Sequence, residues 1–212
     1  KLLTCALPGT AVDDTAKGPA AFETRFGFLS RPARVRFRFL DPDLSIMGLS
    51  DLEIPADDFA RLPVQPDTIF IVENDITALS FPRFQNALVI FGRGYSLSAL
   101  SRACWMARKP LWYWGDMDTH GFAMIDMIRH YFPRTRSFLM DEATLLSHKT
   151  LWGTEPSPVN RDLPLLTPDE ARLYDALRNH IHAPNLRLEQ ERISFTLVRR
   201  AVEDIRVKGF FR

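Results

Sequence analysis

The hydrophobic residues in the middle of the chain form short unbroken runs that alternate with stretches of helical spacing. Four such runs predict buried strands, at 68–72, 87–91, 111–114 and 136–140. Helical spacing of apolar residues follows three of them, at 97–107, at 119–132 and in a stretch through Leu145 and Trp152. Unbroken apolar strands alternating with helices are typical of a parallel sheet covered on both faces. The pattern therefore predicts an α/β unit over residues 63–152.

The part of the chain before this unit has a different pattern. Residues 1–24 are rich in Ala, Gly, Pro, Thr and Asp without a clear period, which indicates an irregular lead-in. Residues 34–40 alternate strictly between arginine and apolar side chains, as in a half-buried strand. A second short strand at 52–54 and a turn of helix near 57–62 are expected next. We therefore expect residues 1–62 to form a lead-in and a small β element.

The part after the α/β unit begins as a linker and ends in helices. Four prolines lie within 154–168. Thr167 is followed by Pro and, three residues on, by Glu, which is the residue pattern of a helix start with a capping box. This helix is expected to run through Ile181, and a last helix is expected over 188–208. Residues 153–212 are thus predicted to be a linker and a helical extension that packs on the α/β unit.

The composition of the chain says more about its cellular location than about any reaction it catalyses. No apolar run approaches the roughly 18–20 residues needed to span a bilayer, and no secretory signal opens the chain. Cys5 and Cys104 form no CxxC pair, so neither a disulfide framework nor a zinc site is indicated. We expect a cytoplasmic protein without a membrane partner. The net charge of +1 argues neither for nor against nucleic-acid binding. Most of the basic residues are Arg, which is explained either by phosphate binding or by a GC-rich genome.

Two aspartates follow the third apolar run directly. Asp116 and Asp118 lie two positions apart, and side chains with this spacing in an extended segment point the same way. Their carboxylates are therefore expected together at the carboxyl end of a buried strand, where open α/β sheets hold their ligands. Two like charges so close repel each other, and a hard cation such as Mg²⁺ is the usual remedy. The alternative is a turn in which Asp118 caps the helix that starts at Thr119.

Acidic residues also follow two other predicted strands, as Glu73 and Asp141. A charge at the end of a fully apolar strand is unfavourable without a partner. One Glu after the first strand and D-x-D after the third is the layout of a Toprim domain, the Mg²⁺-binding unit of topoisomerases, primases and some nucleases. The resemblance predicts a Toprim-like Rossmannoid fold, a parallel sheet with flanking helices.

Three longer strings extend the resemblance to a narrower family. Residues 71–77 (Ile-Val-Glu-Asn-Asp-Ile-Thr), 114–122 (Trp-Gly-Asp-Met-Asp-Thr-His-Gly-Phe) and 188–193 (Leu-Glu-Gln-Glu-Arg-Ile) resemble the JetD subunit of the Wadjet plasmid-defence system. JetD proteins are similar to the A subunit of topoisomerase VI. The likeness covers most of the chain, from the strand near residue 34 to the last helix. It implies cleavage of circular double-stranded DNA, directed by the subunits of an SMC-type motor complex.

The resemblance further implies that Glu73, Asp116 and Asp118 are the metal ligands and catalytic residues, with Mg²⁺ as cofactor and Mn²⁺ able to replace it. Phosphodiester cleavage needs charge neutralisation and an activated nucleophile, and both come from carboxylate-bound Mg²⁺. Glu73 can also accept a proton from the attacking water. No nucleotide cofactor is expected, because the chain has no P-loop sequence.

Topoisomerase VI relatives attack with a tyrosine on a separate domain. No such domain is recognisable upstream of the α/β unit, so hydrolysis by water is favoured over a tyrosyl intermediate, and weak DNA binding by this chain alone is expected. A homodimer is expected by analogy, because two such sites are needed to cut both strands.

Four further residues are candidates for contacts with phosphate or with the carboxylates: Arg93, His120, Lys149 and Glu191. Arg93 lies between two glycines at a strand end, where a plain turn is an equal alternative. For the other three, an ordinary solvated helix surface is the competing interpretation.

Two other functions remain open from the sequence. Residues 116–119 match the D-x-D-x-T motif of haloacid-dehalogenase-like phosphatases, in which Asp116 would be the nucleophile and Asp118 a general acid. Lys149 would serve as that family's lysine, but its final acidic pair is missing, since Glu203 and Asp204 fall inside a predicted helix. The third interpretation is a non-catalytic docking module of a motor complex.

Overall fold

The computed structural model of the chain describes residues 2–18, 21–29, 32–92 and 99–209. These residues group into two compact units, Lys1–Ala33 and Arg34–Arg212. The first unit contains the short helices α1 (Leu2–Ala6), η1 (Gly9–Ala11) and α2 (Phe22–Arg25). The second unit carries the sheet and every described residue of the expected site.

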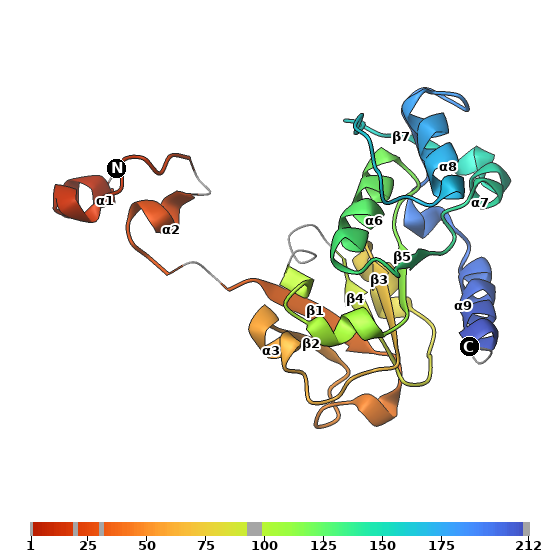
Figure 1. The fold of residues 1–212 in the computed structure, drawn as a ribbon, viewed down its shortest axis with the longest axis horizontal. Coiled ribbons are helices and arrows are strands. Elements are labelled where there is room, and N and C mark those ends of the chain that lie inside the picture. Colours follow the sequence, from red (N-terminus) through yellow and green to blue (C-terminus); the bar gives the residue numbers. More distant parts are fainter. Residues whose placement is uncertain (1, 19–20, 30–31, 93–98, 210–212) are drawn as a thin grey trace. The chain divides into compact units, whose positions relative to one another are not determined.

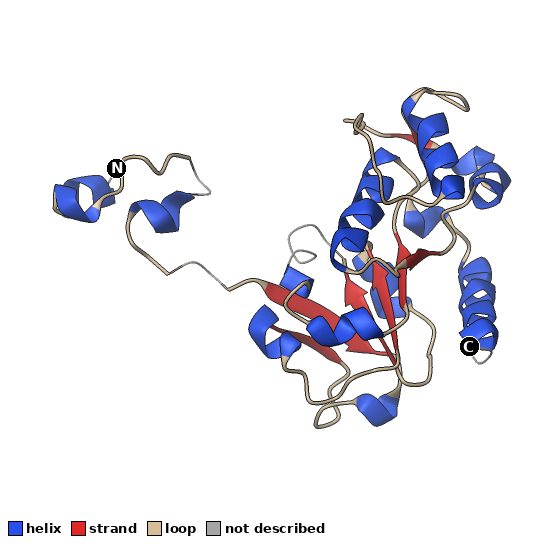
Figure 2. Cartoon of the chain, in the orientation of Figure 1, coloured by secondary structure: helices blue, strands red, loops and turns tan. Residues whose placement is uncertain are grey.

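A six-stranded sheet forms the centre of the second unit (Figures 1 and 2). In spatial order its strands are β2 (Asp51–Pro55), β1 (Arg34–Phe39), β4 (Ala87–Phe91), β3 (Thr68–Val72), β5 (Leu111–Trp114) and β6 (Arg136–Ser137). Strands β4, β3, β5 and β6 are parallel, whereas β1 is antiparallel to both β2 and β4. The expected α/β fold with a parallel sheet is confirmed, and the predicted amino-terminal strands form an antiparallel edge of this same sheet.

Helices connect and flank the strands. The α-helices of the second unit are α3 (Ala56–Ala60), α4 (Asp75–Ser80), α6 (Thr119–Tyr131), α7 (Glu142–Ser147), α8 (Pro168–Arg178) and α9 (Phe195–Gly209). Its 3₁₀ helices are η3 (Pro42–Leu44), η4 (Cys104–Arg108), η5 (Lys149–Leu151) and η6 (Gln190–Arg192). A two-stranded ladder of β7 (Gly153–Thr154) and β8 (Leu186–Arg187) ties the linker to the segment before α9.

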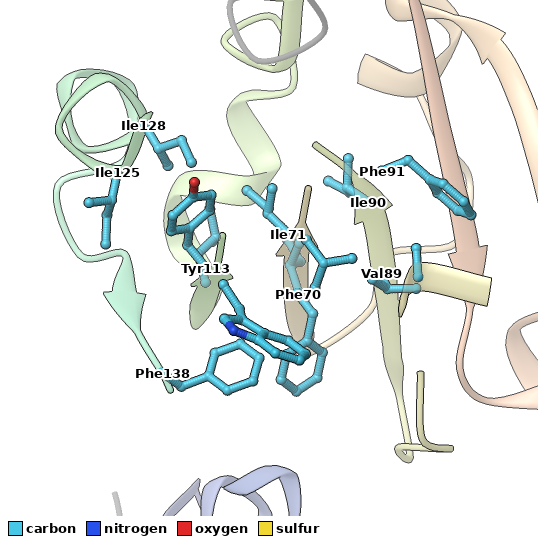
Figure 3. Close-up of a cluster of buried hydrophobic side chains, with 14 of the residues drawn as sticks. Phe70, Ile71, Val89, Ile90, Phe91, Tyr113, Ile125, Ile128 and Phe138 are labelled. Atoms are coloured by element: carbon cyan, nitrogen blue, oxygen red, sulfur yellow. The ribbon is translucent and has the colours of Figure 1, made fainter. Parts of the chain in front are cut away.

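The core lies on the parallel strands, as their unbroken apolar sequences predict. Phe70 and Ile71 of β3 are fully buried, and Figure 3 shows them between the side chains of β4 and those of Tyr113 and Phe138. Helix α6 adds Ile125 and other apolar side chains to the same cluster. Burial of each large side chain stabilises the fold by about 1.5–3 kcal/mol.

The predicted capping box is confirmed at the start of α8. The Thr167 side chain accepts from the backbone N–H of Glu170, and the Glu170 side chain accepts from the N–H of Thr167. The helix ends at Arg178, however, and the prediction that it continues through Ile181 is wrong. His180 has a φ of 58°, in the left-handed region typical of helix ends, and Ile181 is exposed.

Two other predicted elements are shorter than expected. The strand at 136–140 is reduced to β6, because Leu139 has a φ of 56° and turns the chain out of the sheet. Within the described part of the helix predicted at 97–107, residues from Cys104 onward form the 3₁₀ helix η4, which continues to Arg108. Met106 is the buried side chain of η4, and Leu100 and Ala103 before it are buried as well. This spacing of three is that of a 3₁₀ helix.

The largest correction concerns the carboxyl-terminal segment. The predicted helix over 188–208 begins only at Phe195, as α9. Leu188 instead forms a bridge with Met117, next to the expected site. Apolar spacing could not show this, because residues 186–193 are held by pairing with distant parts of the chain.

Candidate functional site

The expected acidic residues follow the carboxyl ends of β3 and β5, which are neighbours in the sheet. Val72 of β3 pairs with Trp114 of β5, so Glu73 and Gly115 leave the sheet side by side. A Cβ atom at Gly115 would lie 2.3 Å from the Tyr113 hydroxyl and 3.0 Å from Cδ of Glu73. Glycine at this position therefore lets the aspartate segment pass close to the Glu73 carboxylate.

Glu73 is held by two donors from the neighbouring strand. The hydroxyl of Tyr113 donates to Oε1, and the backbone N–H of Asp116 donates to Oε2 at 3.4 Å. Burial raises the pKa of Glu73 to about 7, and the negative charges of Asp116 and Asp118 add to this increase. The Tyr113 hydrogen bond acts against the rise without cancelling it.

Asp118 has the capping role that was one of the two sequence interpretations. It is the N-cap of α6, and its Oδ1 accepts from the N–H of Gly121 at 2.8 Å. A Cβ atom at Gly121 would lie 2.0 Å from the backbone oxygen of Asp116, so only glycine fits there. Burial raises the pKa of Asp118 to about 6, with Glu155 and Asp116 as the contributing charges. Capping occupies Oδ1 alone, so this role leaves Oδ2 for another partner.

Asp116 is bound by a segment that sequence reasoning missed. Nε of Arg187 donates to its Oδ2 at 3.1 Å, and a second nitrogen of the same guanidinium donates to the same oxygen. The backbone N–H of Gln190 donates to Oδ1 at 2.7 Å. Arg187 also lies 3.3 Å from Oδ2 of Asp118, so it is the counter-ion of both aspartates.

The Gln190 side chain anchors this segment to the sheet edge. It is fully buried, donates to the Trp114 oxygen at 2.9 Å, and accepts from the N–H of Asn74 at 2.9 Å. Asn74 in turn donates to Glu191 at 3.0 Å. Glu191 thus lies beside the site and contacts it through the residue after Glu73. The Leu-Glu-Gln-Glu-Arg-Ile string was the only sequence signal for this segment.

A second missed residue, Glu155, lies at the amino terminus of α6. Its side chain is 2% exposed, and it accepts from the Thr119 hydroxyl at 2.7 Å and from the N–H groups of Thr119 and His120. Nδ1 of His120 contacts the same carboxylate. Asp118, His120 and Glu155 place ligand atoms within 4.8 Å of one another, and of the residues that the structure describes these form the group spaced to hold a metal ion. This group shares Asp118 with the expected set and contains neither Glu73 nor Asp116.

The remaining candidates lie apart from the carboxylates or outside the described residues. Arg93 belongs to the part that the structure does not describe. Lys149 is exposed on η5, and its side chain has no hydrogen bond or ion pair with any described residue. Asp141 caps α7 by accepting from the N–H of Thr144 at 2.8 Å. Glu203 and Asp204 are exposed on α9.

The phosphatase interpretation loses support from this geometry. The lysine and acidic pair that such a phosphatase would need are not in the site, since Lys149 is exposed on η5 and Glu203 and Asp204 are exposed on α9. Both oxygens of Asp116 accept hydrogen bonds, from Arg187 and from Gln190, so nucleophilic attack and metal binding by Asp116 both require Arg187 to move away. A hard divalent cation fits the donor set better. Glu73, Asp116 and Asp118 supply only carboxylate oxygens, the ligand type that Mg²⁺ prefers. Among the described residues, Arg187 is the guanidinium paired with this group, so negative charge is in excess there.

No described helix is both long and apolar enough to cross a bilayer. No curated protein matches the chain in sequence. A family model described as "Wadjet protein JetD, C-terminal" matches residues 27–202. The match runs from before β1 into α9 and includes Glu73, both aspartates, Glu155 and the segment of Arg187 and Gln190. This confirms the resemblance on which the sequence interpretation depends, and the chain belongs to the JetD carboxyl-terminal family of Wadjet proteins.

Proposed function

We propose that the chain is the metal-dependent DNA endonuclease part of a Wadjet complex, which cleaves circular double-stranded DNA by phosphodiester hydrolysis. The observation that supports this most directly is the meeting of Glu73, Asp116 and Asp118 at one edge of the sheet, with hydrogen bonds that join Glu73 to the aspartate segment. Burial raises the pKa of Glu73 to about 7 and that of Asp118 to about 6, and the charges of neighbouring carboxylates add to both shifts. Among the described residues, the carboxylates of the site outnumber the cation paired with them, Arg187, so negative charge is in excess. Such an excess favours the binding of a cation.

In this proposal Glu73, Asp116 and Asp118 would hold the cation, and Mg²⁺ or Mn²⁺ would, when bound, neutralise charge on the scissile phosphate and activate a water molecule. Tyr113 and the Asp116 N–H fix the orientation of the Glu73 carboxylate. Gly121 fixes that of Asp118. Because the orienting groups are backbone amides and a buried phenol, the carboxylates are preorganised by parts of the chain that have little freedom to move.

The partners follow from family membership and are part of the same proposal. The chain would act with SMC-type motor subunits that bring circular DNA to it, and two copies of the site would be needed to cut both strands. Hydrolysis of ATP would belong to the motor subunits.

The test is cleavage of supercoiled plasmid by the complex reconstituted with Mg²⁺. We expect Glu73→Gln and Asp118→Asn to reduce cleavage by at least about 100-fold, because each keeps the size and shape of the side chain and removes one ligand charge. The amide introduced at position 118 can still accept from the Gly121 N–H, and the amide at position 73 can accept one of the two hydrogen bonds that Glu73 accepts. Asp141→Asn is the matched control, since it alters an acidic helix cap outside the site and should leave cleavage unchanged.

Assembly of the complex is followed in parallel by size-exclusion chromatography. Wild-type cleavage by the Glu73→Gln and Asp118→Asn complexes would contradict the proposal. Loss of assembly rather than cleavage in the same variants would favour the docking-module interpretation.

A further inference from the structure

In both aspartates of the site, Oδ1 accepts a backbone hydrogen bond and Oδ2 faces Arg187. Oδ1 of Asp116 accepts from the backbone N–H of Gln190 at 2.7 Å, and Oδ1 of Asp118 accepts from the backbone N–H of Gly121 at 2.8 Å. Oδ2 of each aspartate faces the guanidinium of Arg187, which hydrogen-bonds to Asp116 and lies 3.3 Å from Oδ2 of Asp118. The guanidinium therefore lies where a cation shared by the two carboxylates would bind.

Arg187 is held in place by its own segment and still has room to move. Its backbone belongs to β8, and Gln190, three residues on, is bonded through its side chain to the carboxyl ends of β3 and β5. The Arg187 side chain itself is 30% exposed. Glu189 lies 3.9 Å from Nη1, so a third carboxylate, besides the two aspartates, is within reach of the guanidinium.

We propose that Arg187 is an internal competitor of the divalent cation and that it sets the metal affinity of the site. This inference depends on the proposed function, because it assumes that Asp116 and Asp118 bind the metal. In the resting arrangement Arg187 balances part of the charge of the two aspartates. When the cation binds, the guanidinium turns towards Glu189, which frees both Oδ2 atoms.

The backbone of the segment need not move during this exchange. The Oδ1 hydrogen bonds to Gln190 and Gly121 are made by main-chain N–H groups, and they keep both carboxylates oriented after Arg187 has left. A factor that favours the turned-out position of Arg187 would raise the metal affinity, and one that favours the inward position would lower it. Competition by Arg187 thus limits how tightly the site binds the metal.

The test is the dissociation constant for Mn²⁺, measured by isothermal titration calorimetry on the full chain near neutral pH. Arg187→Ala removes the competitor, and we expect it to bind Mn²⁺ at least about tenfold more tightly than wild type. Arg187→Gln should change affinity in the same direction, and it keeps a hydrogen-bond donor in case the alanine variant folds poorly. Arg172→Ala is the matched control, because it also removes an arginine from an ion pair, but its partner is Asp169 on α8 and not a carboxylate of the site.

Circular dichroism of each variant verifies the fold. If both Arg187 variants bind Mn²⁺ no more tightly than wild type, the competitor role of Arg187 is wrong. If Asp118→Asn abolishes the Mn²⁺ binding of wild type in the same experiment, the proposed function is left intact. Absence of Mn²⁺ binding in wild type and in both variants at millimolar metal would refute the metal site itself, and the inference with it. Tighter binding without any plasmid cleavage by the complex would support the competitor and count against the nuclease.

Discussion

Near the two ends of helix α6 lie two acidic side chains, Glu170 (buried) and Glu73 (half-buried), whose pKa values are shifted in opposite directions. Near its carboxyl end, Glu170 accepts from two nitrogens of Arg129, from Ser137 and from the N–H of Thr167. Burial raises its pKa, but these hydrogen bonds and the charge of Arg129 outweigh burial and lower the pKa overall. At the amino end, burial and neighbouring aspartates raise the pKa of Glu73 to about 7.

The difference separates a structural ion pair from a site that favours a cation. Arg129 and Glu170 have side chains that are each 6% exposed and balance each other's charge. At the other end, Arg187 pairs with Asp116 and Asp118, whereas Glu73 accepts from the neutral Tyr113 hydroxyl and the Asp116 N–H. Glu73 and Glu170 are both hydrogen-bonded, and burial acts to raise the pKa of each, so burial alone does not give the opposite directions of the two shifts. The two sites differ in the balance of positive and negative charge around the acidic group. The following substitutions test that difference.

We expect the largest effect from Arg129→Ala. The change leaves Glu170 buried without its counter-ion, and loss of one partner of a buried pair lowers the free energy of unfolding by about 3–5 kcal/mol. Urea unfolding followed by circular dichroism measures it. A loss below 1 kcal/mol would mean that the pair contributes no more than a surface ion pair.

The contributions of Glu73 and Glu170 to the free energy of unfolding should change with pH in opposite directions. The folded-state pKa of Glu73 is raised from 4.5 to about 7, so between these values the folded state binds more protons than the unfolded state. The free energy of unfolding of the metal-free protein should therefore fall as pH rises through this window, by at most about 3 kcal/mol. The lowered pKa of Glu170 acts the other way, and its contribution is lost as pH falls below 4.5.

Glu73→Gln tests this assignment, because it keeps the shape of the side chain and removes the titration. Unfolding in urea with a chelator present, repeated across pH, should show a flatter profile between pH 4.5 and 7 for the variant. The same slope in variant and wild type would assign the pH dependence to another group.

A smaller effect is expected from Gln190→Ala. The change leaves the Trp114 oxygen and the Asn74 N–H without their present partner, which should lower the free energy of unfolding by about 2 kcal/mol. Proteolysis of the 186–191 segment should become faster, since its anchor to the sheet is lost. Equal proteolysis rates in variant and wild type would show that β7 and Leu188 suffice to hold the segment.

The smallest effect is expected from Lys149→Ala. The Lys149 side chain is exposed and has no partner among the described residues, so stability and Mn²⁺ affinity should change by less than about 0.5 kcal/mol. A clear loss of DNA binding by the reconstituted complex would instead show that Lys149 contacts phosphate there.

The strands that carry Glu73, Asp116 and Asp118 were predictable because their sequences are unbroken apolar runs. Such runs are stable only when buried on both faces, so β3, β4 and β5 have the predicted bounds. The capping box of α8 was also predictable, because it depends on residues within one turn. Predictions failed where distant partners decide the local conformation, as at Leu139 and over 188–194.

The sequence by itself thus determined the α/β core, the edge at which the acidic residues meet and the family to which the chain belongs. Local apolar patterning and short strings of residues contain that information. Only the tertiary structure decided the charge balance of the site. Arg187 is 71 residues from Asp116 along the chain, and Glu155 is 36 residues from Thr119. Hydrogen bonds between such distant residues depend on how the chain folds back, and no local pattern records them.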